Sequence, residues 1–119
     1  MRRILFAVVL VACSQRGVVD RAPADLRTGS PDVVVLDVRT PEEYEAGHIE
    51  GAINLNVNDS NFANAVSELD HDATYVVHCA ANVPGGRAAR AIDTMRGQGF
   101  EKLENLVGGY AAYQASTER

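Results

Sequence analysis

Tryptophan is absent from this 119-residue chain, and cysteine, methionine and proline are scarce, at two, two and four residues. Two cysteines and three scattered histidines give no spacing that is typical of a zinc site. The longest apolar run, residues 4–12, is well short of the roughly 20 residues that span a bilayer. No internal repeat or long Gly/Ser linker divides the chain. The sequence therefore predicts one globular domain with no metal and no other cofactor.

The start of the chain resembles a bacterial lipoprotein leader. Two arginines follow the first methionine, an apolar stretch comes next, and LVAC at residues 10–13 matches the lipobox, in which the cysteine is lipidated. We expect the protein to be exported and held at the periplasmic face of a membrane by a lipid on Cys13, with an ordinary signal peptide as the alternative. The expected boundaries are a signal peptide over residues 1–12, a tether and lead-in over residues 13–30 and the domain over residues 31–119.

Acidic residues outnumber basic residues in this chain. The 16 Asp and Glu and 11 Lys and Arg give a formal charge of −5. Loss of residues 1–12 removes two arginines, so nine basic residues remain against 16 acidic ones, and the charge becomes −7. An acidic body binds nucleic acid and anionic membranes poorly. We therefore expect no nucleic-acid partner, and contact with a membrane only through the lipid anchor.

Cys79 is the residue that carries the strongest functional signal. It ends an apolar run, residues 75–78, and precedes a glycine-containing loop and a helix that begins near Arg87. A thiol between a strand end and a helix N-terminus lies where backbone N–H groups converge, and such surroundings favour the nucleophilic thiolate. Because Cys13 would carry lipid, Cys79 has no disulfide partner. We interpret it as a reactive thiol, although a buried, inert cysteine would give the same local pattern.

Strand and helix signals alternate along the rest of the chain. The apolar run at residues 33–36 is continuous, as in a strand buried on both faces of a parallel sheet. Thr40, Pro41 and Glu43 form the pattern of a helix capping box. Alternating strands and helices predict an α/β fold whose ligand site lies at the carboxyl ends of the strands. The predicted strands cover residues 33–36, 52–55, 75–78 and 103–106, and the predicted helices begin near residues 41, 62, 87 and 109.

Four sequence blocks together resemble the rhodanese domain. They are residues 36–44 (LDVRTPEEY), residues 47–55 (GHIEGAINL), residues 77–79 (VHC) and residues 106–113 (LVGGYAAY), with Tyr113 where tryptophan is usual. The blocks occur in the family's order over residues 33–113. The resemblance implies a three-layer sandwich with a small central parallel sheet and helices on both faces.

The resemblance also implies a mechanism. The Cys79 thiolate would attack the outer sulfur of a small anionic donor such as thiosulfate, hold that sulfur as a persulfide and pass it to a thiol or to cyanide. Backbone N–H groups and one arginine would bind the anion. The residues implied as substrate-binding are Ala80, Ala81, Asn82, Val83, Gly85, Gly86 and Arg87.

The loop after Cys79 departs from the family pattern. Counted back from Gly99, Arg87 takes the family's arginine position and three extra residues fall between positions 80 and 84. Counted forward from Cys79, Pro84 takes that position. We favour the first alignment, because the length of a helix is harder to change than the length of a loop. On this alignment the loop is longer than those of both the sulfurtransferases and the phosphatase-type relatives.

Two other functions therefore stay open. The altered loop suits a rhodanese-like binding or thiol-sensing module that has lost turnover. A phosphatase or arsenate-reductase-like enzyme would use the same fold, but the loop offers no obvious acid for its leaving group. Asp37, Arg39 and His48 are interpreted as structural residues, and Tyr110 and Tyr113 as packing residues.

Overall fold

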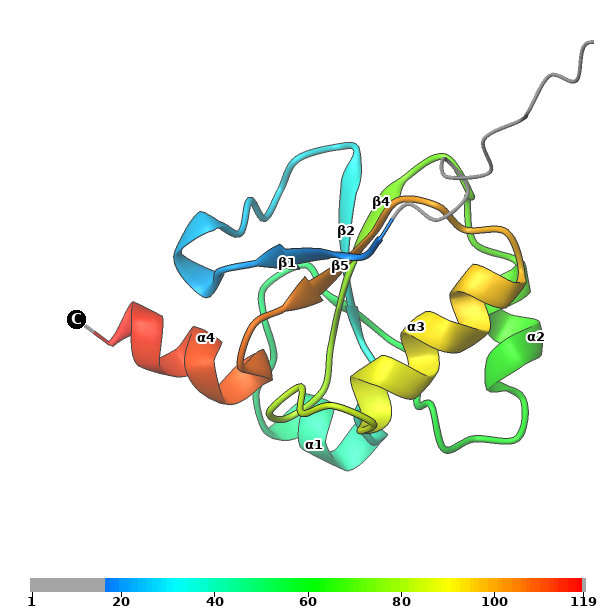
Figure 1. The fold of residues 1–119 in the computed structure, drawn as a ribbon. Helices are drawn as coiled ribbons and strands as arrows, with labels where there is room; N and C mark the ends of the chain where they lie inside the picture. Colours follow the sequence, from blue (N-terminus) through cyan, green and yellow to red (C-terminus); the bar gives the residue numbers. More distant parts are fainter. Residues whose placement is uncertain (1–16, 119) are drawn as a thin grey trace, which may run out of the picture.

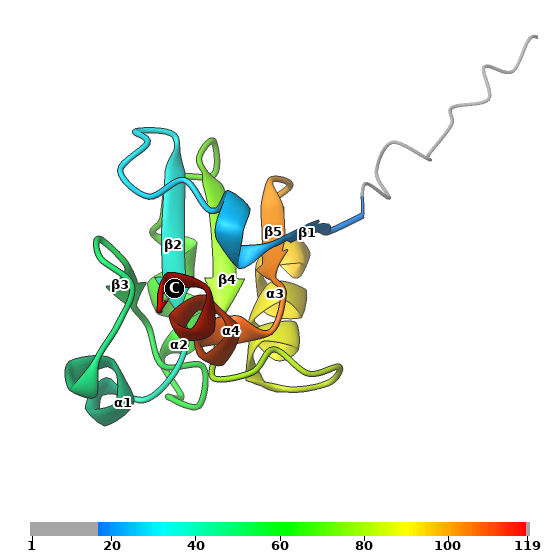
Figure 2. The ribbon, with the colours of Figure 1, turned by 90° about the vertical axis from the view of Figure 1, so that its left-hand side faces the viewer.

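The computed structural model describes residues 17–118, and these form a five-stranded parallel sheet between two layers of helices (Figures 1 and 2). The predicted signal peptide and Cys13 lie outside the described residues. The strands follow the order β1-β5-β4-β2-β3 across the sheet, and all their pairings are parallel. The strands are β1 (Val19–Arg21), β2 (Val33–Asp37), β3 (Ile53–Asn54), β4 (Thr74–His78) and β5 (Leu103–Leu106). The helices are η2 (Pro23–Asp25), α1 (Pro41–Ala46), α2 (Phe62–Ser67), α3 (Arg87–Gly97) and α4 (Gly109–Thr117).

The structure confirms the α/β fold and the predicted elements. Thr40 caps α1, because its hydroxyl accepts a hydrogen bond from the Glu43 N–H while the Glu43 carboxylate accepts one from the Thr40 N–H. Helix α3 begins at Arg87, the position expected when the helix is counted back from Gly99. Residues 19–25, which the sequence analysis assigned to the lead-in, form β1 and η2. Strand β1 pairs with β5 at the sheet edge, where Arg21 binds the Glu104 carboxylate through two hydrogen bonds of 2.8 and 2.9 Å.

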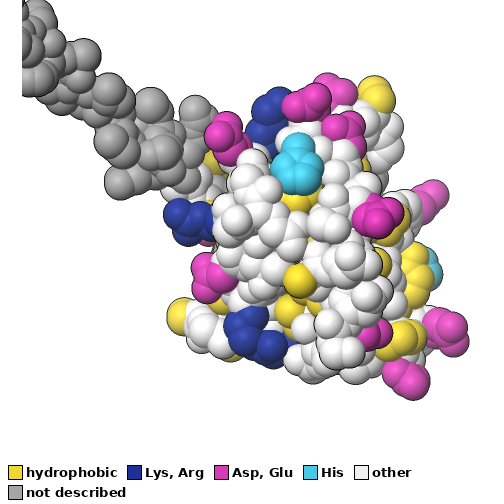
Figure 3. All heavy atoms as spheres, turned by 90° about the vertical axis from the view of Figure 1, so that its right-hand side faces the viewer, with side chains coloured by type: hydrophobic (Ala, Val, Ile, Leu, Met, Phe, Trp, Pro, Cys, Tyr) yellow, Lys and Arg dark blue, Asp and Glu magenta, His cyan; other side chains and the backbone are white. Residues whose placement is uncertain are grey.

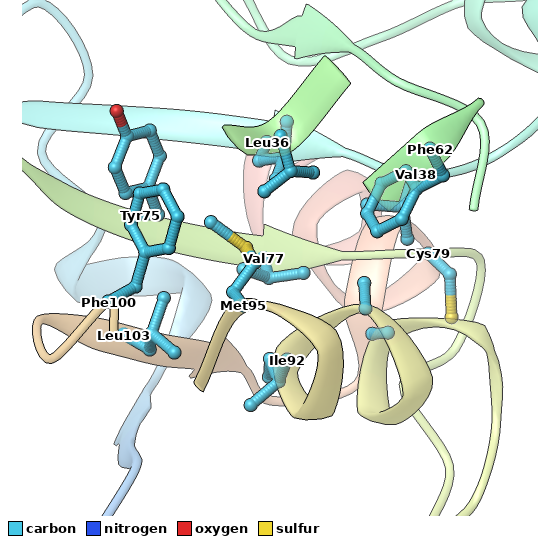
Figure 4. Close-up of a cluster of buried hydrophobic side chains, with 13 residues drawn as sticks. Leu36, Val38, Phe62, Tyr75, Val77, Cys79, Ile92, Met95, Phe100 and Leu103 are labelled. Carbon is cyan, nitrogen blue, oxygen red and sulfur yellow. The ribbon is translucent and has the colours of Figure 1, made fainter. Parts of the chain in front are cut away.

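Each face of the sheet buries its own apolar cluster, because successive side chains of a strand point to opposite faces. On one face, Tyr75 and Val77 of β4 pack against α2 and α3 through Phe62, Ile92 and Met95 (Figure 4). On the other face, Val76 packs with Leu106 against Leu26, which follows η2, and against side chains of α1 and α4. Strand β4 is therefore buried on both sides, which explains its unbroken apolar sequence.

The outer surface over α2 and α3 is mixed in charge. Acidic side chains lie around the margin of this face, and its basic side chains form separate groups rather than one stripe (Figure 3). Within residues 17–118, no helix has both the length and the apolar character that crossing a membrane requires.

Candidate active site

Cys79 lies directly after β4, at the carboxyl edge of the sheet. Its side chain points to the α3 face, as those of Tyr75 and Val77 do, and belongs to the same apolar cluster. Figure 4 shows its sulfur beside the chain that leads into α3. The residue is 4% exposed and its thiol is free. In parallel α/β sheets this edge is where ligands bind.

The N-terminus of α4 fixes the backbone around Cys79 from the opposite face of the sheet. The N–H of Tyr110 donates a 3.0 Å hydrogen bond to the Cys79 carbonyl, and the N–H of Ala111 donates a 3.0 Å bond to the Ala80 carbonyl. These bonds require a close approach at Gly109, where a Cβ would lie 2.8 Å from the backbone of Ala80 and Ala81. Gly109 also has a φ of +65°, which favours glycine. The start of α4, residues 109–111, therefore fixes the backbone of the loop that follows Cys79.

This anchoring determines where the first N–H groups of the loop point. In a planar trans peptide the N–H points opposite to the carbonyl, and the described chain has no cis peptide. Because the carbonyls of Cys79 and Ala80 face α4, the N–H groups of Ala80 and Ala81 point to the α3 side, where the sulfur lies. Among the described residues, the N–H groups of residues 80–83 and of Gly85 have no protein hydrogen-bond partner. They form a set of donors available to an anion.

Asn82 holds the middle of the loop. Its Oδ1 accepts a 2.7 Å hydrogen bond from the Cys79 N–H, and its Nδ2 donates to the Val77 carbonyl at 3.1 Å and to Oδ1 of Asn105 at 2.7 Å. Asn105 in turn donates to Asp20 of β1 at 3.2 Å. Asn82 has a φ of +53°, a left-handed conformation that asparagine tolerates better than most residues. Its side chain therefore connects the loop to two strands of the sheet.

A turn closes the loop before α3. The N–H of Gly86 donates to the Val83 carbonyl at 3.0 Å, and Gly85 adopts a φ of +74°. Val83 is 55% exposed at this turn. Within residues 17–118, no side chain caps the start of α3, so its first N–H groups remain available as donors at the end of the loop.

Arg87, at the start of α3, is held by Glu43 of α1. Its Nη1 and Nη2 donate to the two carboxylate oxygens of Glu43 at 2.7 and 3.2 Å. The hydrogen bond from Arg87 is the largest cause that lowers the pKa of Glu43 from 4.5 to about 2, and the bonds from Thr40 add to it. The same ion pair is the main cause that raises the pKa of Arg87, and negative charge at Cys79 adds a smaller contribution. Arg87 therefore lies at the end of the loop that begins at Cys79, with its charge paired to Glu43.

Asp37 and Arg39 form a second ion pair beneath the site. Asp37 is fully buried, and Arg39 donates to it through Nε at 2.9 Å and Nη2 at 2.7 Å. Arg39 also donates to the Gly47 carbonyl at 2.8 Å and lies over the Tyr110 ring, 4.3 Å from its centroid. These contacts agree with the structural role expected for both residues.

His78 occupies a buried position next to Cys79. Its Nδ1 lies 3.0 Å from the Cys79 carbonyl, and its Nε2 lies 3.7 Å from Oδ2 of Asp37 without a hydrogen-bond partner in the described part of the chain. A ring nitrogen this close to a carbonyl oxygen carries the proton, so the neutral ring is the Nδ1–H tautomer. Burial lowers the pKa of His78, so the ring stays neutral at pH 7.

The residues predicted to bind substrate form the loop after Cys79 and the start of α3, but only some of their polar groups are available. The N–H of Gly86 and the side chain of Asn82 are used inside the loop, and both terminal nitrogens of Arg87 are held by Glu43. Sequence reasoning assigned Glu43 to the helix cap and missed its second role. No local signal joins Glu43 to Arg87, because they lie 44 residues apart.

Comparison with known proteins identifies the family. The model of the Rhodanese-like domain matches residues 21–116, so the chain belongs to the rhodanese-like family. An uncharacterised protein of Bacillus subtilis, YqhL, is 31% identical over 107 residues, which cover 90% of this chain and 81% of YqhL. The thiosulfate sulfurtransferase GlpE of Shewanella oneidensis is 33% identical over 86 residues, or 72% of this chain and 80% of GlpE.

A solved structure agrees with this assignment. The rhodanese-related protein of Thermoplasma volcanium superposes with a TM-score of 0.71 and 27% identity, over 83% of this chain and 93% of that protein. The comparisons therefore support sulfur transfer as the activity of the family to which the chain belongs.

Proposed function

We propose that this protein is a sulfurtransferase or persulfide carrier that moves sulfane sulfur through Cys79. The observation that carries the proposal is the free Cys79 thiol at the sheet edge, followed by a loop whose N–H groups lack protein partners among the described residues. Membership of the rhodanese-like family and the similarity to GlpE support the same chemistry.

The reaction has two displacement steps. The Cys79 thiolate attacks the outer sulfur of thiosulfate, a new S–S bond forms, the S–S bond of the donor breaks, and sulfite leaves with the electron pair. Cyanide or a thiolate then attacks the outer sulfur of the Cys79 persulfide and regenerates the thiolate. No external oxidant or reductant is needed. The N–H groups of Ala80 and Ala81 stabilise the anionic persulfide, and the start of α3 adds its positive dipole end.

We also propose that the protein works outside the cytoplasm, anchored through a lipid on Cys13. The proposal rests on the leader-like residues 1–13 of the sequence. The donor and acceptor are then small molecules or thiols at the periplasmic face of the membrane.

A thiocyanate assay tests the proposed activity. The purified full-length chain is mixed with thiosulfate and cyanide, and thiocyanate is measured with time. We expect the Cys79→Ser variant to form no more thiocyanate than the mixture without protein. The Cys13→Ser variant is the matched control for the other cysteine and should keep the wild-type rate. Equal rates for the wild type and Cys79→Ser would exclude sulfur transfer through Cys79.

One observation favours a second role, a binding or thiol-sensing module without turnover. Cys79 is only 4% exposed, so a large substrate has little access to it, and the guanidinium of Arg87 is already paired with Glu43 rather than free to bind an anionic substrate. This role predicts that Cys79 reacts once with a small thiol reagent while no thiocyanate forms.

A further inference from the structure

Glu43 joins the two helix starts that flank the site. Its carboxylate accepts hydrogen bonds from Nη1 and Nη2 of Arg87 on α3, and from the N–H and hydroxyl of Thr40 at the cap of α1. The Glu43 side chain is 37% exposed and that of Arg87 is 23% exposed, so the pair lies at the surface of the site. Since the pKa of Glu43 is lowered to about 2, the carboxylate keeps its negative charge at neutral pH.

This ion pair neutralises the positive charge of Arg87, which would otherwise attract an anionic donor. Arg87 is the cation of the active-site segment, and both of its terminal nitrogens point at Glu43. Arg39, the other arginine beside the site, is neutralised in the same way by Asp37. A donor at Cys79 therefore meets backbone N–H dipoles and two neutral ion pairs rather than a free guanidinium from Arg39 or Arg87.

We propose that Glu43 is a specificity-determining residue that favours sulfur donors of low negative charge, such as the persulfide of a small neutral thiol, over dianionic thiosulfate. Coulomb energy is proportional to the charge of the donor, so dianionic thiosulfate is repelled by the Glu43 carboxylate, whereas a neutral persulfide R–S–SH is not. This inference rests on the proposed function and names the substrate class of the same site.

The chemistry with such a donor is balanced. The Cys79 thiolate attacks the outer sulfur of R–S–SH, a Cys79 persulfide forms, the S–S bond of the donor breaks, and the thiolate RS⁻ leaves with the electron pair. The transferred sulfur keeps its proton, so the product is the protonated Cys79 persulfide. The same persulfide results as with thiosulfate, so the two donors can be compared in one assay.

The test compares persulfide formation on Cys79 from thiosulfate and from mercaptoethanol persulfide, measured by mass spectrometry as a second-order rate constant. The variant is Glu43→Gln, since glutamine has the same shape and can still serve in a capping box. In water-rich surroundings, loss of one charge at a separation of several ångströms changes the rate about threefold per unit of donor charge. We therefore expect about a tenfold gain with dianionic thiosulfate, little change with the neutral persulfide R–S–SH and about a tenfold shift in their ratio.

The matched control is Glu42→Gln, which removes the same charge from an exposed neighbour that makes no side-chain hydrogen bond to any described residue. It should leave the ratio of the two rate constants unchanged. A second variant, Arg87→Met, leaves Glu43 unpaired and should shift the ratio in the opposite direction, against thiosulfate. Circular dichroism verifies that each variant folds.

The outcomes separate this inference from the proposed function. An unchanged ratio in Glu43→Gln, or an equal shift in Glu42→Gln, would overturn the role of Glu43 even if Cys79 accepts sulfur. Failure of the wild type to form a persulfide with either donor would instead refute sulfur transfer itself. Opposite shifts for Glu43→Gln and Arg87→Met, with no shift in the control, would support the inference.

Discussion

Replacement of Asn82 by glycine should loosen the active-site loop without straining its backbone. Glycine adopts the φ of +53° freely, so the change removes only the three side-chain hydrogen bonds to Cys79, Val77 and Asn105. At about 1 kcal/mol for each bond, we expect the free energy of unfolding to fall by about 3 kcal/mol. This is a large part of the roughly 5–15 kcal/mol that is typical of a small domain.

Two further variants separate the hydrogen-bond contribution of Asn82 to stability from the contribution of its backbone conformation. Alanine loses the same bonds and must also adopt a left-handed conformation, which costs about 1 kcal/mol more. Aspartate keeps the acceptor for the Cys79 N–H but loses the two Nδ2 donors. Urea unfolding at neutral pH should therefore rank stability as wild type, then aspartate, then glycine, then alanine. A loss below about 0.5 kcal/mol for glycine would refute the role assigned to the three bonds, and an alanine variant as stable as the glycine one would refute the argument from φ.

Two other changes follow from the packing beneath the loop. Gly109→Ala puts a Cβ 2.8 Å from the loop backbone at a φ of +65°. Urea unfolding should therefore show that the free energy of unfolding falls by about 3 kcal/mol. The control Gly51→Ala, at a φ of +84° in open space, should lower it by only about 1 kcal/mol. Equal losses would contradict the close approach. Because burial lowers the pKa of His78, the unfolded chain binds more protons, so wild-type stability should fall as pH drops below about 6.5. His78→Asn should flatten that fall between pH 8 and pH 5, and an unchanged slope would contradict the assignment.

The parts of the fold that the sequence predicted are those set by local chemistry. The run at residues 33–36 indicated a strand buried on both faces, and Thr40 with Glu43 indicated the start of α1, because apolar periodicity and capping act over a few residues. The start of α3 at Arg87 was predicted by counting back from Gly99, because the length of a helix is harder to change than the length of a loop. The resemblance of the four sequence blocks to the rhodanese domain then indicated how these strands and helices are arranged.

The contacts that define the site could not be predicted in this way, since they join residues far apart in the chain. The bond from Asn82 to Asn105 and the ion pair of Arg87 with Glu43 depend on how the sheet brings loops together. Asn82 was predicted to bind substrate, whereas its side chain connects the loop to β4 and β5. The signal in the sequence for this structural role was that asparagine tolerates a left-handed conformation in a loop. The contact of the His78 ring with the Cys79 carbonyl also depends on the folded chain.

The most direct test of the central claim is the mass of the peptide that contains Cys79 after the protein is incubated with thiosulfate or a small persulfide. Sulfur transfer through Cys79 predicts a gain of one sulfur atom, about 32 Da, on that peptide in the wild type. The gain should be absent from Cys79→Ser, and addition of cyanide should reverse it. A Cys79 peptide of unchanged mass with both donors, in a folded protein, would contradict the account.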